Sequence, residues 1–521
     1  MTLTQGNQPP GAIRLGAALL VGGLLLTGCG GAGGSADESG HKSSRGSADE
    51  PAVPSGPDVL APEGTPEGTA EGAAGEDRRS TFALDVDTAS YGYARRSLGE
   101  GRLPEPGTVR PEEFVNSFRQ DYPRPEGNGF SVTVDGARTG GDGWRLMRVG
   151  LATARPPAEG ERPPAALTFV VDISGSMAEP GRLDLVRESL TTLTGRLRAD
   201  DSIALVTFSD EARTVLPMTR LGPPGGEHRD RVRGAVDTLE PTDSTNLEAG
   251  VETGYATAVE GVRAGATNRV VLLSDALANT GATSADTILE RIADARREHG
   301  ITLFGVGVGS DYGDALMERL ADKGDGHTTY VSSAADARKV FVQQLPAHVQ
   351  LRAREAKAQV EFDADTVVEH RLLGYENRRV ADDDFRADSV DGGEVGPGHT
   401  VTALYAVRLR DGAEGEVAEA TVRWLAPATR APREASGRVT VSDLDGELWS
   451  SDTTPRLRVA AVAGYFADRL GGTAERRGFP GTPTLPQLSD HVQQLVPVTE
   501  DADVRRLREA IREAMRLGVR Q

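Results

Sequence analysis

Three short oxygen-rich segments in the middle of the chain carry the residue types of a cation-binding site. The first is D-I-S-G-S at 172–176, which follows the apolar run 166–171. The second is D-S-T-N at 243–246, before a predicted helix, and the third is S-D at 274–275, after N-R-V-V-L-L at 268–273. Ligands of open α/β sheets bind beyond the carboxyl ends of the strands. We therefore expect the three segments to meet at one edge of a sheet.

Hydroxyl and carboxylate oxygens are the ligands that hard divalent cations prefer, and Mg²⁺ tends to keep several waters in near-octahedral geometry. Three hydroxyls with one or two carboxylates make a weak cage with an open position, which suits a carboxylate from a partner protein. The alternative is that these Asp and Ser residues only cap the helices that follow them. Three spaced segments in this order favour the cation site.

The elements around these segments alternate between apolar strands and amphipathic helices over residues 165–345. Strands are predicted at 166–174, 201–209, 268–276 and 301–310, with helices that include 182–197 and 285–299 between them. Nearly continuous apolar strands indicate burial on both faces. The sequence therefore predicts an α/β fold with a mostly parallel central sheet and helices on both of its faces.

The D-x-S-x-S run, the threonine of the second segment and the aspartate of the third segment resemble the metal-ion-dependent adhesion site of von Willebrand factor type A (VWA) domains. These domains have a Rossmann-like fold and occur also in integrins, and the resemblance covers residues 165–345. The direct hydroxyl ligands that it implies are Ser174, Ser176 and Thr245. Asp172 and Asp275 would hold the ion mostly through water.

The resemblance implies Mg²⁺ as the bound ion, with Mn²⁺ or Ca²⁺ as alternatives. One position departs from the family pattern, because the glycine that usually follows the last aspartate is Ala276 here. A side chain at that position narrows the backbone conformations available, so we expect a modest effect on metal affinity.

The segments 80–164 and 346–521 flank the α/β block and are both rich in predicted strands. We hypothesise that they pair into one sandwich-like domain into which the α/β block is inserted. The motifs STFALDVDTASYGYARRSL, LLGYENRRVADDDF and GEVGPGHTVTALYAV resemble the flanking segments of YfbK-like bacterial VWA lipoproteins. This second resemblance extends over nearly all of 80–521 and bears on architecture more than on mechanism.

Residues 1–28 have the pattern of a secretory signal peptide, with Arg14 ahead of a short apolar run. The run ends in L-T-G-C, which resembles the lipobox of bacterial lipoproteins, so we expect diacylglycerol on the sulfur of Cys29. The alternative is a buried apolar helix with an incidental cysteine. Residues 29–79, rich in Gly, Ser, Pro and Glu, predict a disordered acidic tether. Together they predict a protein anchored by lipid on the extracytoplasmic face of a cell membrane.

Composition excludes several classes of function. The 521 residues include 58 Lys and Arg against 78 Asp and Glu, a formal net charge of −20 that repels nucleic acid. A single cysteine excludes a disulfide framework and a zinc site built on several cysteines.

Two further motifs have simpler explanations than function. The G-V-G-V-G run at 305–309 lies in an apolar strand and lacks the third spaced glycine of a nucleotide-binding loop. Asp85 and Asp87 suggest a second cation site or paired catalytic acids, but alternating strand polarity and a helix cap explain them more simply.

Helices are predicted at 457–470 and 502–517, near the end of the chain. The second has an apolar stripe, formed by Val504, Leu507, Ile511 and Met515. Docking of this stripe on a membrane surface is one interpretation, and packing on the rest of residues 346–521 is the favoured one.

These observations predict a non-enzymatic, metal-dependent protein-binding lipoprotein that captures an Asp or Glu side chain of a partner through the open metal position. The alternatives are a structural envelope assembly factor with a vestigial metal site and, less favoured, a hydrolase in which the metal activates water and Asp172 or Asp275 is the base. Mg²⁺ polarises water weakly, and no His or Glu base is evident near these segments.

Overall fold

The computed structural model describes residues 78–84, 87–140, 143–154, 162–242, 244–275, 285–308, 320, 327–331, 333–338, 340–341, 351–388, 390, 392–427, 429–472 and 478–519. The predictions on the signal peptide, Cys29, Asp85 and Asp243 lie outside these residues, as does the tether up to residue 77. The predicted tether extends too far at its end, because Arg79 begins the strand β1 Arg79–Ala83. Among the described helices, none has both the length and the hydropathy that crossing a bilayer requires.

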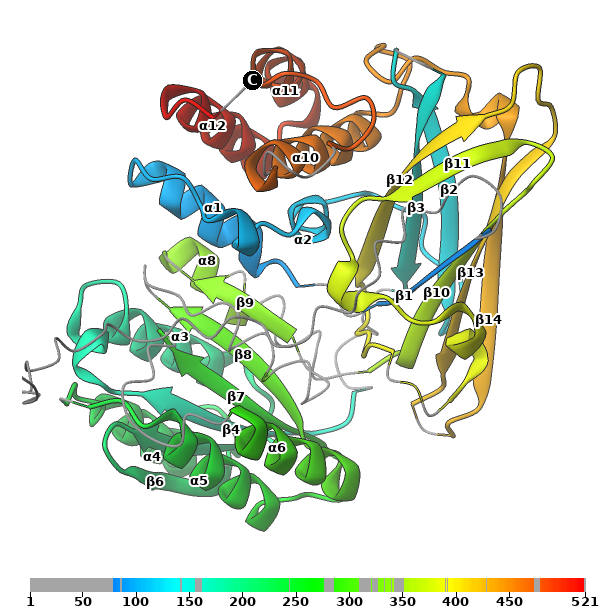
Figure 1. Ribbon diagram of the computed structural model, residues 1–521. Coiled ribbons are helices and arrows are strands. Elements are labelled where there is room, and N and C mark those ends of the chain that lie inside the picture. The colour runs from blue at the N-terminus through cyan, green and yellow to red at the C-terminus, as the bar shows by residue number, and fades with distance from the viewer. Residues whose placement is uncertain are drawn as a thin grey trace, which may run out of the picture. The chain divides into compact units, whose positions relative to one another are not determined.

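Six strands of the described α/β block form one sheet in the order β6-β5-β4-β7-β8-β9 (Figure 1). The strands are β4 Ala165–Asp172, β5 Ser202–Phe208, β6 Ala212–Arg220, β7 Thr267–Ser274, β8 Thr302–Val308 and β9 His327–Val331. Neighbouring strands are parallel except β5 and β6, which are antiparallel. The helices are α3 Leu183–Arg196, α4 Glu227–Asp237, α5 Leu247–Glu260, α6 Ala285–His299 and α8 Ala334–Arg338.

The two faces of this sheet pack into two separate cores. Phe169 and Val170 are neighbours in β4 and fully buried, but alternate side chains of a strand point to opposite faces. Phe169 packs with residues of α3 and α4, and Val170 with residues of α5 and α6. Helices therefore cover both faces, and the predicted α/β fold class is confirmed.

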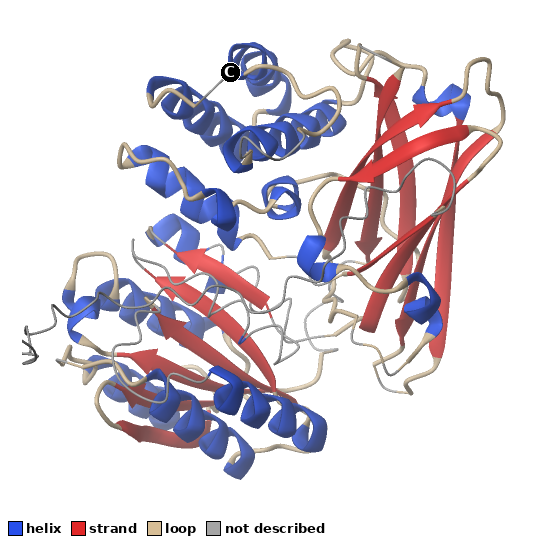
Figure 2. Cartoon of the chain, in the orientation of Figure 1, coloured by secondary structure: helices blue, strands red, loops and turns tan. Residues whose placement is uncertain are grey.

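The flanking segments form two antiparallel sheets, which Figure 2 shows beside the α/β sheet. One has the described strands β1 Arg79–Ala83, β10 Arg354–Phe362, β13 Glu416–Leu425 and β14 Pro432–Thr440, in the order given. The other has β11 Val367–Leu372, β12 Thr400–Leu409, β3 Trp144–Thr153 and β2 Phe130–Arg138. Because β1 pairs with β10 and β3 pairs with β12, strands from both sides of the α/β block share each sheet. The hypothesis of one sandwich assembled from both flanks is confirmed.

Helices cover the outer face of the sheet β11-β12-β3-β2. They are α1 Ala89–Gly99, α2 Pro111–Asn116, α10 Pro455–Gly471, α11 Leu485–Thr499 and α12 Ala502–Arg516. Leu146 and Ala406 of the sheet belong to the same buried core as these helices, whereas Met147 and Val407 face the interior of the sandwich. The sequence analysis did not predict α11, although T-L-P-Q at 484–487 forms a capping box at its start.

The apolar stripe of α12 packs inside the protein along most of its length. Val504, Leu507 and Ile511 are fully buried, which confirms packing for these three positions. Met515 differs, because 39% of it is exposed at the last turn of the helix.

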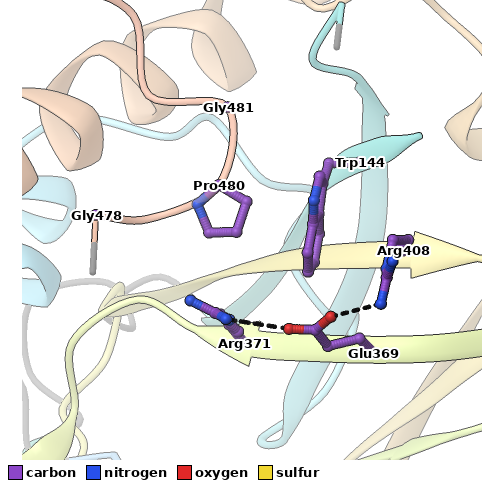
Figure 3. A pocket seen from close by; sticks show the side chains of 7 residues that line it. All are labelled: Trp144, Glu369, Arg371, Arg408, Gly478, Pro480 and Gly481. Atoms are coloured by element: carbon purple, nitrogen blue, oxygen red, sulfur yellow. Dashed lines mark hydrogen bonds and ion pairs between the residues drawn. The ribbon is translucent and has the colours of Figure 1, made fainter. Parts of the chain in front are cut away.

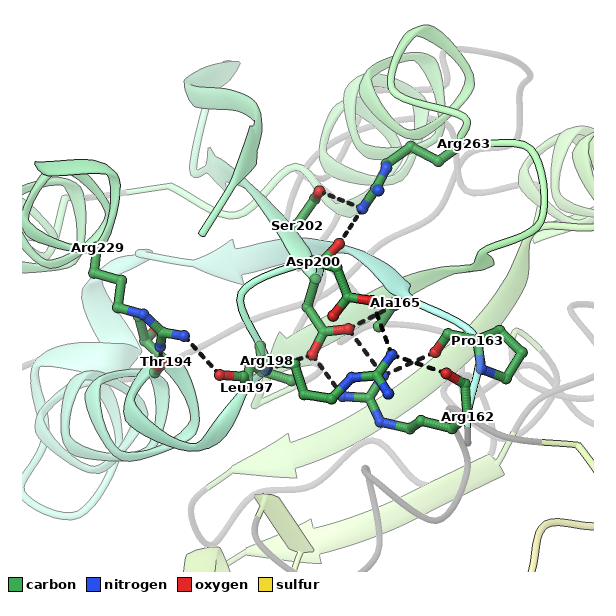
Figure 4. Close-up of polar contacts among 11 residues, drawn as sticks. Arg162, Pro163, Ala165, Thr194, Leu197, Arg198, Asp200, Ser202, Arg229 and Arg263 are labelled. Carbon is green, nitrogen blue, oxygen red and sulfur yellow. Dashed lines mark hydrogen bonds and ion pairs between the residues drawn. The ribbon is translucent and has the colours of Figure 1, made fainter. Parts of the chain in front are cut away.

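The buried carboxylate of Asp201 fixes the entry of the chain into the α/β sheet. Its donors Arg162, Ala165 and Arg198 are labelled in Figure 4. Asp201 accepts hydrogen bonds from Arg162 Nη1 at 2.8 Å and Nη2 at 2.5 Å, from the Ala165 amide at 2.8 Å and from the Arg198 amide at 2.7 Å. Because Ala165 begins β4 and Asp201 precedes β5, this one side chain aligns the starts of two central strands.

Asp87 does not cap α1, contrary to the expectation from the sequence. The N-cap residue is Thr88, and it makes no side-chain capping bond. Asp87 instead accepts hydrogen bonds from the amide and the hydroxyl of Thr328 in β9, both at 2.7 Å, and lies 3.4 Å from Arg378. It thereby ties the segment before α1 to the edge strand of the α/β sheet.

Candidate metal centre

Asp172 is the last residue of β4, which lies between β5 and β7. Its carboxylate is fully buried and accepts hydrogen bonds from the Ser174 amide at 2.8 Å and from Ser274 Oγ at 2.6 Å. Burial raises the pKa of Asp172 to about 6, although these hydrogen bonds act in the opposite direction. Asp172 is thus oriented by both its own loop and the end of the neighbouring strand.

The loop after β4 presents two hydroxyls side by side. The bond from the Ser174 amide back to Asp172 closes a tight turn, and the short 3₁₀ helix Gly175–Ala178 follows. Met177 is 1% exposed and anchors this helix in the core, so that Ser174 Oγ and Ser176 Oγ lie 3.1 Å apart. Two hydroxyl oxygens at this separation can ligate one cation.

The loop that carries Thr245 is tied to the same edge of the sheet. The Thr242 amide donates to the carbonyl of Ile173 at 2.6 Å, and the Asn246 amide donates to the carbonyl of Ser209 at 2.5 Å. The side chain of Asn246 also caps the N-terminus of α5. Thr245, 1% exposed, is therefore held between two loops that follow β4 and β5.

Asp275 follows β7 and is fully buried. Arg182 Nη1 donates to Asp275 Oδ2 at 2.6 Å and to the Ser176 carbonyl at 2.9 Å, so this guanidinium joins the third segment to the first. The other oxygen, Asp275 Oδ1, is buried and has no hydrogen-bond partner among the described residues.

The structure places Asp172, Ser174 and Ser176 in one hydrogen-bonded loop. Arg182 connects Asp275 to that loop, because it donates to both Asp275 and the Ser176 carbonyl. The loop of Thr245 is connected to it by the hydrogen bond from the Thr242 amide to the Ile173 carbonyl. Asp243 and Ala276 lie outside the described residues.

Capping explains only part of this arrangement. Ser174 is the N-cap residue of the 3₁₀ helix but makes no side-chain capping bond, whereas Asn246 does cap α5. The donor set fits a hard cation, because it offers hydroxyl oxygens and a buried carboxylate oxygen without a hydrogen bond. Ser174, Ser176 and Thr245 would hold the ion, which would supply an open coordination position.

Two residues with roles here were not assigned by the sequence analysis. Ser274 lies in the third segment, and its role in orienting Asp172 follows from the pairing of β4 with β7. Arg182 could not be found from the sequence, since 93 residues separate it from Asp275.

Comparison with family models gives three matches. Residues 166–344 match the von Willebrand factor type A domain, residues 348–468 match "Uncharacterized protein YfbK, C-terminal", and residues 68–143 match a family described as von Willebrand factor.

The chain is 36% identical over 340 residues to the uncharacterized protein YfbK of Escherichia coli, an alignment that covers 63% of this chain and 58% of that protein. It is 26% identical over 180 residues to human inter-alpha-trypsin inhibitor heavy chain H3, covering 33% of this chain and 20% of that protein. The chain therefore spans less than two thirds of either relative. A solved structure, the von Willebrand factor type A protein from Catenulispora acidiphila, is 16% identical with a TM-score of 0.41, covering 77% of this chain and 89% of that one.

Proposed function

Because the chain is a VWA-domain protein similar to YfbK over much of its length, we propose that it is a membrane-anchored, metal-dependent protein-binding lipoprotein. In this proposal, residues 166–344 bind Mg²⁺, and the ion captures an Asp or Glu side chain of a partner protein. Lipid at Cys29 holds the protein to the membrane, with residues 30–77 as a tether.

The observation that carries the proposal is the meeting of the predicted ligand segments at the carboxyl edge of the sheet. Ser174 Oγ and Ser176 Oγ lie 3.1 Å apart. Arg182 joins Asp275 to the Ser176 carbonyl, and Asp275 Oδ1 is buried without a hydrogen-bond partner among the described residues. A buried carboxylate oxygen without a partner is costly, and a cation nearby offsets that cost.

The ligand chemistry supports a role in binding. Mg²⁺ held by neutral hydroxyls keeps more of its charge than one held by several carboxylates, so it attracts an anionic ligand from outside. One metal–carboxylate contact cannot distinguish partners, and the surrounding loops must supply specificity.

Thermal unfolding of the full-length chain in EDTA, Mg²⁺, Mn²⁺ or Ca²⁺ tests metal binding. A ligand that binds only the native state raises its stability by mass action, so Mg²⁺ at 100 times its Kd should add about 2.7 kcal/mol. The Ser174→Ala and Asp172→Ala variants should lose this effect, and Asp237→Ala, an exposed carboxylate at the end of α4, should keep it.

The open position is tested with Mn²⁺ in place of Mg²⁺. Water bound to Mn²⁺ relaxes bulk protons, and a peptide with a Glu side chain that enters the metal's coordination shell displaces that water and lowers the relaxation rate. The matching Gln peptide should leave the rate unchanged. Absence of metal binding, or partner capture that survives Ser174→Ala, would favour the structural assembly factor instead.

A further inference from the structure

Four carboxylates lie in the loops beside the proposed metal centre, at the carboxyl edge of the α/β sheet. Glu179 belongs to the loop after β4, and Asp210 and Glu211 belong to the turn between β5 and β6. Glu240 lies between the end of α4 and Thr245. All four residues are exposed. We call these four residues the acidic rim.

Hydrogen bonds attach two parts of the acidic rim to the segments of the predicted ligands. The Asn246 side chain donates to the carbonyl of Asp210 at 3.3 Å. The Thr242 amide, two residues after Glu240, donates to the carbonyl of Ile173 at 2.6 Å. The predicted ligand of the second segment lies between Thr242 and Asn246, so the rim is held on both sides of it.

Glu179 is held beside the first ligand segment. Its amide donates to the carbonyl of Ser176 at 3.3 Å, and its carboxylate lies 2.8 Å from Arg182 Nη2. The Glu179 side chain is 62% exposed, whereas that of Arg182 is 2% exposed and also pairs with Asp275. Glu179 therefore keeps its place next to Ser176 while most of its side chain faces solvent.

The other three members of the acidic rim form no ion pair with a described residue. Arg213, the second residue of β6, is the exposed base that follows them in the sequence, so carboxylates exceed bases here. The sequence after β7 and β8 adds no excess of bases, because 276–284 has no charged residue and 309–326 has five acidic residues against two basic ones. The rim is therefore a negative surface.

A carboxylate on the sandwich, in contrast, is matched by arginines. Glu369 of β11 lies in one row with Arg408 of β12 and Trp144 of β3, because the three strands pair in that register. Its carboxylate is 2.8 Å from Arg408 Nη2 and 3.1 Å from Arg371 Nη2, as Figure 3 shows. An acid held in this way leaves little charge for a partner, so the acidic rim is the better surface for a basic one.

We propose that the partner segment carries its Asp or Glu between basic residues, an inference that rests on the proposed metal-dependent binding. Asp172 and Asp275 against Arg182 leave one negative charge at the centre, and a bound Mg²⁺ turns it into one positive charge. The acidic rim lies in the loops beside this positive centre. A segment with an acid in the middle and a base on either side matches both charges, whereas the rim repels a wholly acidic segment.

Four acetylated and amidated tripeptides separate the contribution of the ion from that of the rim. They are Lys-Glu-Lys, Ser-Glu-Ser, Glu-Glu-Glu and Lys-Gln-Lys, each titrated by calorimetry into the full-length chain with saturating Mg²⁺. At low salt, Lys-Glu-Lys should bind with a Kd near or below about 1 mM and about tenfold more tightly than each of the others. Its preference over Ser-Glu-Ser should fall to about threefold in about 0.5 M NaCl, because salt screens surface charges.

The variant with Asp210→Asn, Glu211→Gln and Glu240→Gln should bind Lys-Glu-Lys and Ser-Glu-Ser to within about threefold of each other, because the rim loses its unmatched charge. Glu227→Gln is the matched control. That carboxylate is 89% exposed at the start of α4, which follows the end of β6, at the opposite edge of the sheet. The control should keep the tenfold preference.

The outcomes distinguish this inference from the proposed function. If the natural chain binds no Mg²⁺, the proposed metal centre fails and the inference fails with it. If Mg²⁺ binds, the inference alone is overturned by equal binding of Lys-Glu-Lys and Ser-Glu-Ser, by binding of no peptide, or by a preference that persists in the triple variant. Binding of Lys-Gln-Lys as tight as that of Lys-Glu-Lys also overturns it, because the rim would then take up cations without the ion.

Discussion

Arg182 and Asp275 form a buried ion pair at the predicted metal centre, with 2.6 Å between Nη1 and Oδ2 and side chains that are 2% and 0% exposed. The same guanidinium holds the carbonyl of Ser176, and its Nη2 lies 2.8 Å from Glu179. A fixed positive charge therefore lies against a carboxylate that the metal site is expected to use. In the proposed metal site this charge would repel a divalent cation and lower the affinity for it.

Given the proposed metal site, Arg182→Gln should bind Mg²⁺ about tenfold more tightly than the natural protein, because the repulsion is removed and Asp275 keeps its full charge. The metal-free variant should be less stable by about 3 kcal/mol, since a buried carboxylate loses its partner. Calorimetric Mg²⁺ titration and thermal unfolding measure both effects, and the stabilisation by Mg²⁺ should be larger than in the natural protein.

Arg182→Lys is the control, because it keeps the charge and loses the forked geometry. Its Mg²⁺ affinity should stay close to that of the natural protein. If Arg182→Gln and Arg182→Lys both bind Mg²⁺ more weakly than the natural protein, the guanidinium serves to position Ser176 and not to oppose the ion.

Asp87 should matter to stability because it is 2% exposed and joins three parts of the chain. In Asp87→Asn, an amide replaces one carboxylate oxygen, so an N–H group faces donors of Thr328 and Arg378. We expect a loss of about 3 kcal/mol in the free energy of unfolding. Hydrogen exchange at the Thr328 amide should also become faster, since that amide donates directly to Asp87.

The comparison variant is Asp383→Asn, whose side chain is 93% exposed and pairs with Arg79 at the surface. Surface pairs contribute little, so its stability should change by less than about 1 kcal/mol. Equal stability of the two variants in urea denaturation would show that Asp87 does not tie β9 to the flanking segment.

The sequence was sufficient to predict the α/β sheet and the placement of the ligand segments. Buried parallel strands leave a strong local signal, as in β4, and parallel strands bring Asp172 and Asp275 to one edge whatever the loops do. Pairing of the two flanks was also predictable as a hypothesis, since strands without partners in one segment need partners in another.

Contacts between distant side chains left no such signal. Arg182 and Asp87 find their partners 93 and 241 residues away, and no local pattern encodes those distances. The row of Glu369, Arg408 and Trp144 depends on strand register, which residue periodicity alone does not fix. Residues whose roles depend on such long-range contacts were therefore assigned only with the structure.

The lowered pKa of Asp201 predicts how the free energy of unfolding changes at low pH. Desolvation acts to raise its pKa, but the hydrogen bonds from Arg162, Ala165 and Arg198 outweigh burial and hold the pKa below its usual value of 3.8. Since the folded state binds the proton less tightly than the unfolded chain does, the carboxylate contributes stability above pH 3.8. That contribution is lost as the pH falls through the lowered pKa.

Asp201→Asn should therefore be less stable than the natural protein at pH 7, by about 3 kcal/mol, because Arg162 and two backbone amides lose a charged acceptor. The difference between the two proteins should begin to shrink below pH 3.8, where Asp201 of the unfolded chain takes up a proton while the folded protein still holds it charged. Urea denaturation from pH 7 to pH 3 measures it, with Asp200→Asn, a neighbouring carboxylate that is 37% exposed, as the control. A difference that stays constant over this range would show that the shape of the side chain, and not its charge, aligns β4 with β5.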